Sequence, residues 1–140
     1  MELKLFPQHT GIWEGTYTRI NEKGQVIDLH RSRLTLKLEG NAWHQKNEYT
    51  WDNGKKETHD FGVSYFNKDN VLIFDNQRIK GEAWEADQVI VLHWIYKDTP
   101  GSHLYEIITL LENGHRMRTW QHSLNGQFTG LTMIEERRIS

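Results

Sequence analysis

The densest group of chemically capable side chains lies in residues 115–124, with the sequence His-Arg-Met-Arg-Thr-Trp-Gln-His-Ser-Leu. In a β-strand, successive side chains point to opposite faces, so one face carries Arg116, Arg118, Trp120 and His122. Guanidinium groups bind carboxylates through paired hydrogen bonds, and an indole can cover an apolar body. This face predicts a binding site for a small amphipathic anion, with the two arginines as the acid anchor.

The opposite face of the same segment decides whether that site exists. It carries His115, Met117, Thr119 and Gln121. If this second face pointed inward, the arginine face would form only cross-strand pairs in solvent. We expect the arginine face to point inward, because His115 and Gln121 would fill an interior no better.

Neighbouring segments supply further candidate ligand contacts. Tyr105 belongs to a mostly apolar stripe that also contains Ile107, Thr109 and Leu111. We expect this stripe to point inward, which would place Glu106 on the solvent side. Trp43 lies on the aromatic, amide-bearing face of residues 42–52. Tyr105 and Trp43 are therefore predicted to line the same site.

Acid–base catalysis is the alternative use of these side chains. His122 or His93 could move a proton while Arg118 steadies a carboxylate or an enolate, and Tyr105 adds a hydroxyl. The sequence has no nucleophile elbow and no phosphate-binding glycine loop. The alternative hypothesis is a cofactor-independent cyclase, isomerase, lyase or decarboxylase.

Metal ions and cofactors are not predicted. None of the eight histidines occurs at His-x-His or His-x₃-His spacing. Haem needs a single axial histidine, so His93 or His122 leaves haem open without favouring it.

The composition excludes several classes of protein. The chain has 17 basic and 19 acidic side chains, a net charge of -2 and no cysteine. Nucleic-acid binding needs a basic face, and disulfide frameworks and thiolate chemistry need cysteine. No apolar run approaches the length of a membrane span, and no hydrophobic signal segment precedes Pro7. We expect a cytoplasmic protein whose partner is a small molecule.

Turn signals divide the chain into short strands. Asn-Gly pairs, which favour type I′ hairpin turns, occur at 53–54, 113–114 and 125–126. The predicted strands are 11–20, 25–38, 42–52, 55–66, 71–75, 77–85, 88–97, 103–112, 115–124 and 127–138, after a possible helical turn within the first nine residues. A sheet of about ten consecutive antiparallel strands avoids unpaired edge strands best by closing into a barrel. We predict one all-β domain over residues 1–140, a closed up-and-down barrel, with a two-sheet sandwich as the alternative.

The ends of the predicted barrel suggest a family. Gly11-Ile-Trp13 opens the first strand and Glu135-Glu-Arg-Arg138 closes the last, which resembles lipocalin-type barrels of the calycin superfamily. The resemblance implies that Trp13 packs under Arg137 or Arg138 and closes the barrel floor. With residues 11–18 and 116–122, the pattern is most similar to small cyanobacterial-type lipocalin-like proteins of unassigned activity.

The points at which the sequence departs from secreted lipocalins limit the functions that the resemblance implies. The Thr-Asp-Tyr triplet and the disulfides of secreted lipocalins are missing, which argues against an extracellular carrier. Fatty-acid-binding proteins share the barrel and hold a carboxylate with arginine and tyrosine on late strands. The first hypothesis is therefore a carrier with an internal cavity, and the third, after the enzyme, is an interaction module with an exposed aromatic patch on its wall.

Overall fold

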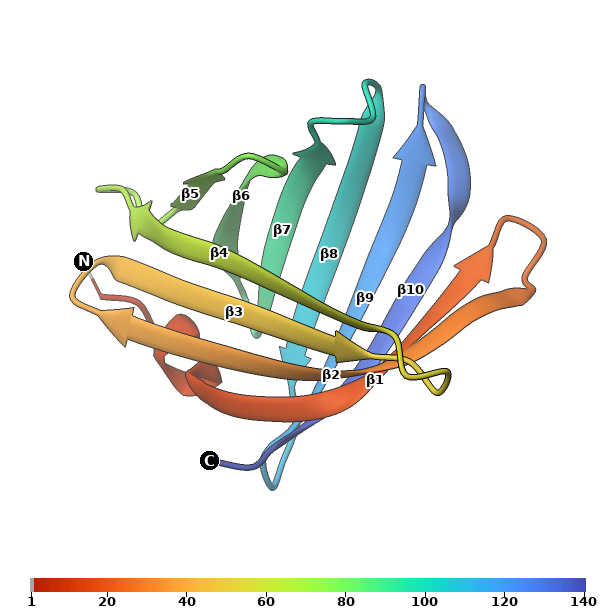
Figure 1. The fold of residues 1–140 in the computed structure, drawn as a ribbon. Helices are drawn as coiled ribbons and strands as arrows, with labels where there is room; N and C mark the ends of the chain where they lie inside the picture. Colours follow the sequence, from red (N-terminus) through yellow and green to blue (C-terminus); the bar gives the residue numbers. More distant parts are fainter. Residues whose placement is uncertain (1) are drawn as a thin grey trace.

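The protein is a closed antiparallel barrel, described over residues 2–140 of the computed structural model (Figure 1). This part of the chain forms one 3-10 helix and ten strands: η1 Phe6–His9, β1 Gly11–Asn21, β2 Val26–Glu39, β3 Ala42–Thr50, β4 Lys56–Phe66, β5 Leu72–Asp75, β6 Ile79–Ala86, β7 Val89–Tyr96, β8 Ser102–Leu110, β9 His115–Leu124 and β10 Gln127–Arg138. Each strand pairs with the next, and β10 returns to β1. The predicted barrel is confirmed, and the sandwich alternative is wrong.

Tight turns make the consecutive pairing possible. Asn125 and Gly126 have φ angles of 51° and 81°, as a two-residue type I′ turn between β9 and β10 requires. Asn113 and Gly114 also have positive φ. Between β3 and β4, only Gly54 does, because Trp51 and Lys55 close a three-residue loop there. The type I′ prediction at that hairpin is therefore wrong, although the hairpin itself is present.

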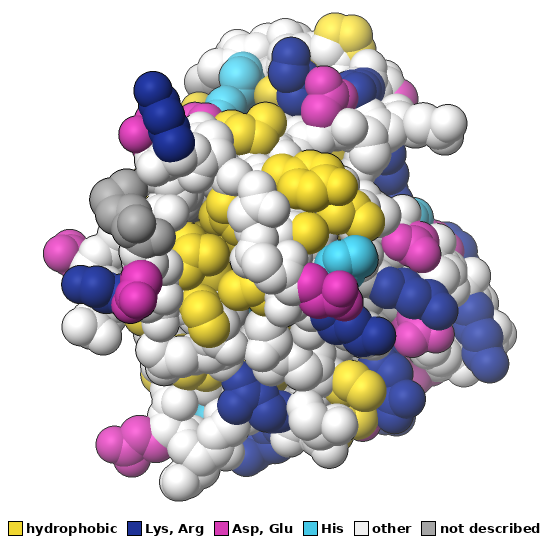
Figure 2. Space-filling model, turned by 90° about the vertical axis from the view of Figure 1, so that its left-hand side faces the viewer, with side chains coloured by type: hydrophobic (Ala, Val, Ile, Leu, Met, Phe, Trp, Pro, Cys, Tyr) yellow, Lys and Arg dark blue, Asp and Glu magenta, His cyan; other side chains and the backbone are white. Residues whose placement is uncertain are grey.

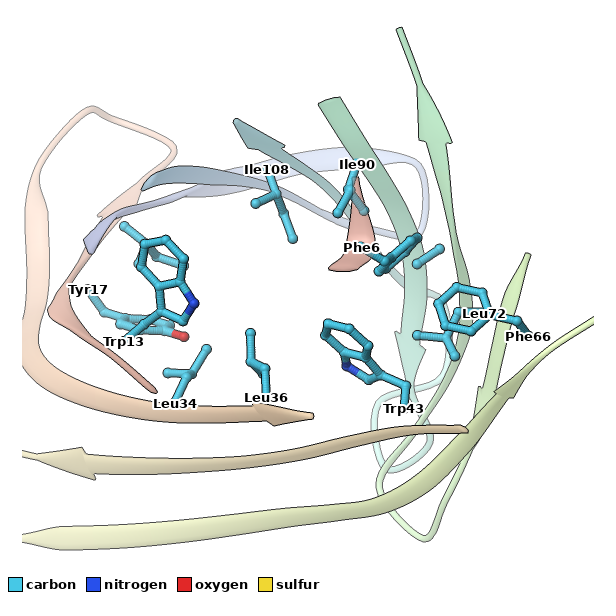
Figure 3. Packing of buried hydrophobic residues seen from close by; sticks show 12 residues of the cluster. Phe6, Trp13, Tyr17, Leu34, Leu36, Trp43, Phe66, Leu72, Ile90 and Ile108 are labelled. Carbon is cyan, nitrogen blue, oxygen red and sulfur yellow. The ribbon is translucent and has the colours of Figure 1, made fainter. Parts of the chain in front are cut away.

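The hydrophobic core fills one end of the barrel, where η1 lies across the opening (Figure 3). Phe6 of η1 packs edge-on against Phe66 and Trp43, with ring centroids 4.7 and 5.4 Å apart. The side chain of Glu85 accepts hydrogen bonds from the backbone N–H groups of residues 4–6 and holds this segment in place. This end of the barrel is the floor, and the opposite end is the mouth.

The seam between β4 and β5 is the weakest part of the barrel wall. Only Tyr65 with Ile73 and Phe66 with Leu72 pair across it in the described chain. Residues 56–64 of β4 therefore diverge from β5, and the wall opens to one side. Hydrophobic side chains gather on the face of the molecule that carries this seam, with charged side chains around them (Figure 2).

No helix within residues 2–140 has the length and apolar character needed to cross a membrane.

Candidate ligand-binding cavity

A cavity of about 340 Å³ occupies the barrel above the core and opens at the mouth. This volume lies within the usual range for small-molecule sites. Inward side chains of nearly every strand line it, including Tyr17, Arg19, His30, Trp43, Tyr49, Trp51, His59, Phe74, Arg78, Leu92, Trp94, Tyr96, Glu106, Arg118, Trp120 and His122. Aromatic rings dominate this set.

One wall of the cavity is a column of neighbouring rings on β1, β2 and the residue just after β3. His30 lies between Tyr17 and Trp51, with ring centroids 4.8 and 4.4 Å away and interplanar angles of 22° and 33°. Asp28 fixes the column, because it accepts hydrogen bonds from His30 Nδ1 at 2.8 Å and Trp51 Nε1 at 2.9 Å. Partial burial opposes ionisation of Asp28, but these hydrogen bonds outweigh it and lower its pKa.

A second aromatic wall comes from β7 and β9. Trp94 and Trp120 meet edge to face with centroids 5.1 Å apart, and Trp120 also meets Tyr17 at 5.7 Å. Trp120 Nε1 is buried and has no hydrogen-bond partner of good geometry within residues 2–140, but Trp120 pairs with Glu106 and helps to lower the pKa of that carboxyl group. His122 bonds Thr132 at 2.8 Å. Burial, with help from Arg19, lowers the pKa of His122 to about 4, so this ring is neutral at pH 7.

The floor of the cavity is a buried ionic network. Arg118 donates through Nε to Glu136 at 2.9 Å, through Nη1 to Glu106 at 2.9 Å, and through Nη2 to the Tyr17 hydroxyl. Arg116 donates through Nε to Glu136 at 2.7 Å and through Nη1 to His9 Nδ1 at 3.2 Å. Two cations thus meet two carboxylates, and the network can be neutral as a whole.

Burial sets the protonation of this network. It raises the pKa of Glu106 more than Arg118 lowers it, whereas for Glu136 the two arginines outweigh burial and lower the pKa. Burial and Arg116 together lower the pKa of His9 to about 3. His9 is therefore neutral, which lets its Nδ1 accept the hydrogen bond from Arg116.

Below the network, Trp13 closes the barrel. Its ring lies between two guanidinium groups, those of Arg116 and Arg138, each 4.6 Å from the ring centroid. Its indole N–H donates to the backbone oxygen of His9 at 3.0 Å. Arg138 thus makes the contact expected of it, while the exposed Arg137 points outward and Arg116 takes the second side of the ring.

The structure brings together some of the residues singled out in the sequence. The arginine face of β9 points inward as expected, and Arg118, Trp120 and His122 line the cavity, as does Trp43. Arg116 points inward too, but it lies beneath the cavity, against Trp13 and His9, and does not line it.

Tyr105, His93 and Glu106 correct the prediction for β7 and β8. Tyr105 is 50% exposed on the outer wall, where it stacks on His93 with centroids 4.9 Å apart. His93 in turn bonds His103 at 2.8 Å. Glu106, expected in solvent, is buried at the floor. The apolar stripe of β8 covers the outside of the barrel, and a charged residue fits inside because Arg118 compensates it.

Two arginines at the mouth, Arg19 and Arg78, were not predicted from the sequence. Arg19 of β1 donates to the backbone oxygens of Ile20 and Thr129, and Arg78, just before β6, contacts His59 and lies 5.8 Å from the Tyr96 ring. Neither arginine forms an ion pair with any carboxylate in residues 2–140. No sequence motif marks either residue, because strands far apart in the chain bring them to the mouth.

A closed antiparallel barrel with an internal cavity defines this protein as a lipocalin-like barrel. The chain belongs to the DUF3598 family: the model of the N-terminal domain of this family, described as a domain of unknown function, matches residues 2–140. The predicted membership of a lipocalin-like family without assigned activity is confirmed. No curated protein matches the chain.

Among the solved structures similar to this chain, two illustrate the fold. One is a DUF3598 protein of unknown function from Nostoc punctiforme, with 16% identity and a TM-score of 0.73 over 99% of this chain. Our chain spans about half of that protein, 51% of its length. The other is the S-type phycobiliprotein lyase CPES from Guillardia theta, with 16% identity and a TM-score of 0.67 over 97% of this chain and 91% of that one. At this identity both show a shared fold.

Proposed function

We propose that the barrel binds a flat, conjugated small molecule between its aromatic walls, with an acidic end of the ligand at the mouth. The observation that carries this proposal is that two aromatic walls line the cavity, the ring column of Tyr17, His30 and Trp51 and the pair Trp94 and Trp120. Aromatic faces stack on other π systems, which gives a planar ligand more contact than a flexible alkyl chain of similar size.

The position of the acidic end follows from charge. Arg118 faces the cavity, but Glu106 and Glu136 already balance its charge, so the floor offers a ligand carboxylate no free cation. Arg19 and Arg78 at the mouth make no ion pair in the described chain and could meet a carboxylate while staying partly hydrated. The ligand carboxylate is therefore proposed to bind Arg19 and Arg78 at the mouth, and the earlier assignment to Arg116 and Arg118 is replaced.

Open-chain tetrapyrroles are the first ligand class to test. They are conjugated, amphipathic and carry two propionate groups, which matches aromatic walls below a cationic mouth. The similarity to a phycobiliprotein lyase adds only that a barrel of this shape serves in a protein named for that activity.

A titration with biliverdin tests the proposal. Quenching of tryptophan fluorescence should saturate at one ligand per chain, because Trp43, Trp51, Trp94 and Trp120 line the cavity. Biliverdin dimethyl ester, which lacks the acids, should bind several-fold more weakly, and oleate, an acid without a conjugated body, weaker still. Equal affinity for oleate and biliverdin would contradict a site for flat ligands.

An enzymatic role of the same cavity is the second candidate, and the observation that favours it is Glu106. This carboxyl group lies at the cavity floor with a raised pKa, beside Arg118. A protonated Glu106 could give a proton to a conjugated ligand, and neutral His122 could accept one. A change in the absorption spectrum of bound biliverdin, slowed by E106Q or H122Q without loss of binding, would support catalysis. An unchanging spectrum leaves the carrier role.

A further inference from the structure

The outer surface of the barrel is divided into two unlike halves. Outward side chains of β2 to β6 mix exposed apolar residues, such as Tyr65 and Ile73, with many charged residues, such as Arg31, Lys46 and Asp60. The outward positions of β7, β8 and β9, together with Leu131 and Met133 of β10, contain no lysine, arginine, aspartate or glutamate in the described chain. We call this second surface the uncharged wall.

The pairing register of β7 to β10 places the outward residues of the uncharged wall side by side across the four strands. Val91 of β7 pairs with Ile107 of β8, Ile107 with Thr119 of β9, and Thr119 with Met133 of β10. Large apolar side chains stand out from it: Tyr105 is 50% exposed, Ile107 47% and Met133 42%. An exposed apolar surface that crosses four strands is unusual for a monomer and is typical of an interface.

Charged residues border the uncharged wall without entering it. Glu82 of β6 lies beside His93, and Glu135 and Arg137 of β10 lie beside Met117 and His115. Protein interfaces have this anatomy, in which charged residues are depleted at the centre and a polar rim surrounds it.

We propose that a second copy of this chain covers the uncharged wall, so that two barrels form a two-fold dimer. In a two-fold interface each patch meets itself, and any charge near the axis would face an identical charge. The uncharged wall has no lysine, arginine, aspartate or glutamate near such an axis, and its only titratable side chains in the described chain are His93, His103, His115 and Tyr105.

The wall is large enough for such an interface. A nine-residue strand such as β8 is about 30 Å long, and four adjacent strands are about 19 Å wide. The wall therefore projects on the order of 600 Å², and its side-chain relief exposes more. Stable interfaces bury about 800 Å² on each partner.

Sedimentation velocity of the full chain tests the dimer. At tens of micromolar, we expect a species of twice the monomer mass of 16.7 kDa. I107K should shift the equilibrium to monomer by at least tenfold in the dissociation constant, because two lysines would be brought together near the axis. The matched control is I73K, since Ile73 has nearly the same exposure, 46%, on the other half of the barrel; this variant should remain dimeric.

A second variant, T119K, distinguishes loss of the dimer from loss of folding. Thr119 is exposed at the centre of the wall, so T119K adds a charge without removing any buried group, and circular dichroism should be unchanged. T119K should also be monomeric. A wild-type chain that is monomeric at these concentrations would overturn the proposal and leave the wall to another partner. A dimer that survives both T119K and I107K would place the interface elsewhere and equally overturn it.

Discussion

The floor and the mouth of the barrel contain the same kinds of side chain in opposite electrostatic states. At the floor, Arg116 and Arg118 are buried against Glu106 and Glu136, and the charges balance within the protein. At the mouth, the hydrogen bonds of Arg19 within residues 2–140 go to backbone oxygens, and no carboxylate pairs with it there.

The comparison teaches that an inward arginine is not by itself a ligand anchor. A buried guanidinium without a carboxylate would cost several kcal/mol, so the fold supplies carboxylates from the neighbouring strands β8 and β10. Those carboxylates then occupy the hydrogen-bonding groups that a ligand acid would need. An arginine near solvent has no such requirement and remains available.

The largest effect should come from breaking the balance at the floor. E136Q removes the charge shared by Arg116 and Arg118, so the free energy of unfolding should fall by about 3–5 kcal/mol. The neighbouring E135Q is a matched control, because Glu135 is exposed and bonds only His115 in the described residues; it should cost less than about 1 kcal/mol. Urea unfolding followed by circular dichroism measures both. Equal losses would show that the floor network does not stabilise the fold.

Acid should weaken the floor through His9. The folded pKa of His9 is about 3 against 6.5 in the unfolded chain, so below pH 6.5 protons bind preferentially to the unfolded state. Stability from this group is complete above pH 6.5 and falls by about 1.4 kcal/mol per pH unit as the pH drops.

The variant H9N isolates this contribution, because an amide oxygen can still accept from Arg116 but does not titrate. Between pH 6.5 and 5 the wild type should lose about 2 kcal/mol more than H9N, by urea unfolding at each pH. Parallel pH profiles for the two proteins would contradict a neutral buried His9.

A smaller effect is expected at the aromatic wall of the mouth. W51L removes one face of the ring column and should weaken biliverdin binding about tenfold, the value of one stacking contact. W84L is the matched control, because Trp84 lies on the outer surface beside Val91 and does not line the cavity. If W84L weakens binding as much as W51L does, the ligand lies outside the barrel.

The smallest effect should be that of the acid anchor. R19Q should weaken biliverdin binding about three- to tenfold and leave its dimethyl ester unaffected, because a partly hydrated ion pair contributes about 1 kcal/mol. R31Q removes an exposed arginine of the outer surface and should change neither affinity. Isothermal titration calorimetry at two salt concentrations measures both variants, and an equal loss for acid and ester would argue against an ion pair at Arg19.

Much of the fold could be predicted from the sequence, because Asn-Gly turns and alternation are local signals. Alternation placed Arg116, Arg118, Trp120 and His122 on one face of β9, and the composition of the other face favoured the inward choice without requiring it. The burial of Glu106 could not be predicted, because alternation defines two faces of β8 without saying which is inward, and the apolar face turned out to be the outer one. Arg19 and Arg78 could not be found, because their common place at the mouth depends on the closure of the whole barrel.

The most direct test follows the six tryptophan indole N–H signals by ¹⁵N–¹H NMR while biliverdin is added. Trp51, Trp94 and Trp120 line the cavity and should shift strongly, whereas Trp84 on the outer surface and Trp13 below the floor should barely move. That pattern is the predicted result. Shifts centred on Trp84, or no shifts at a saturating ligand concentration, would contradict a binding site between the aromatic walls.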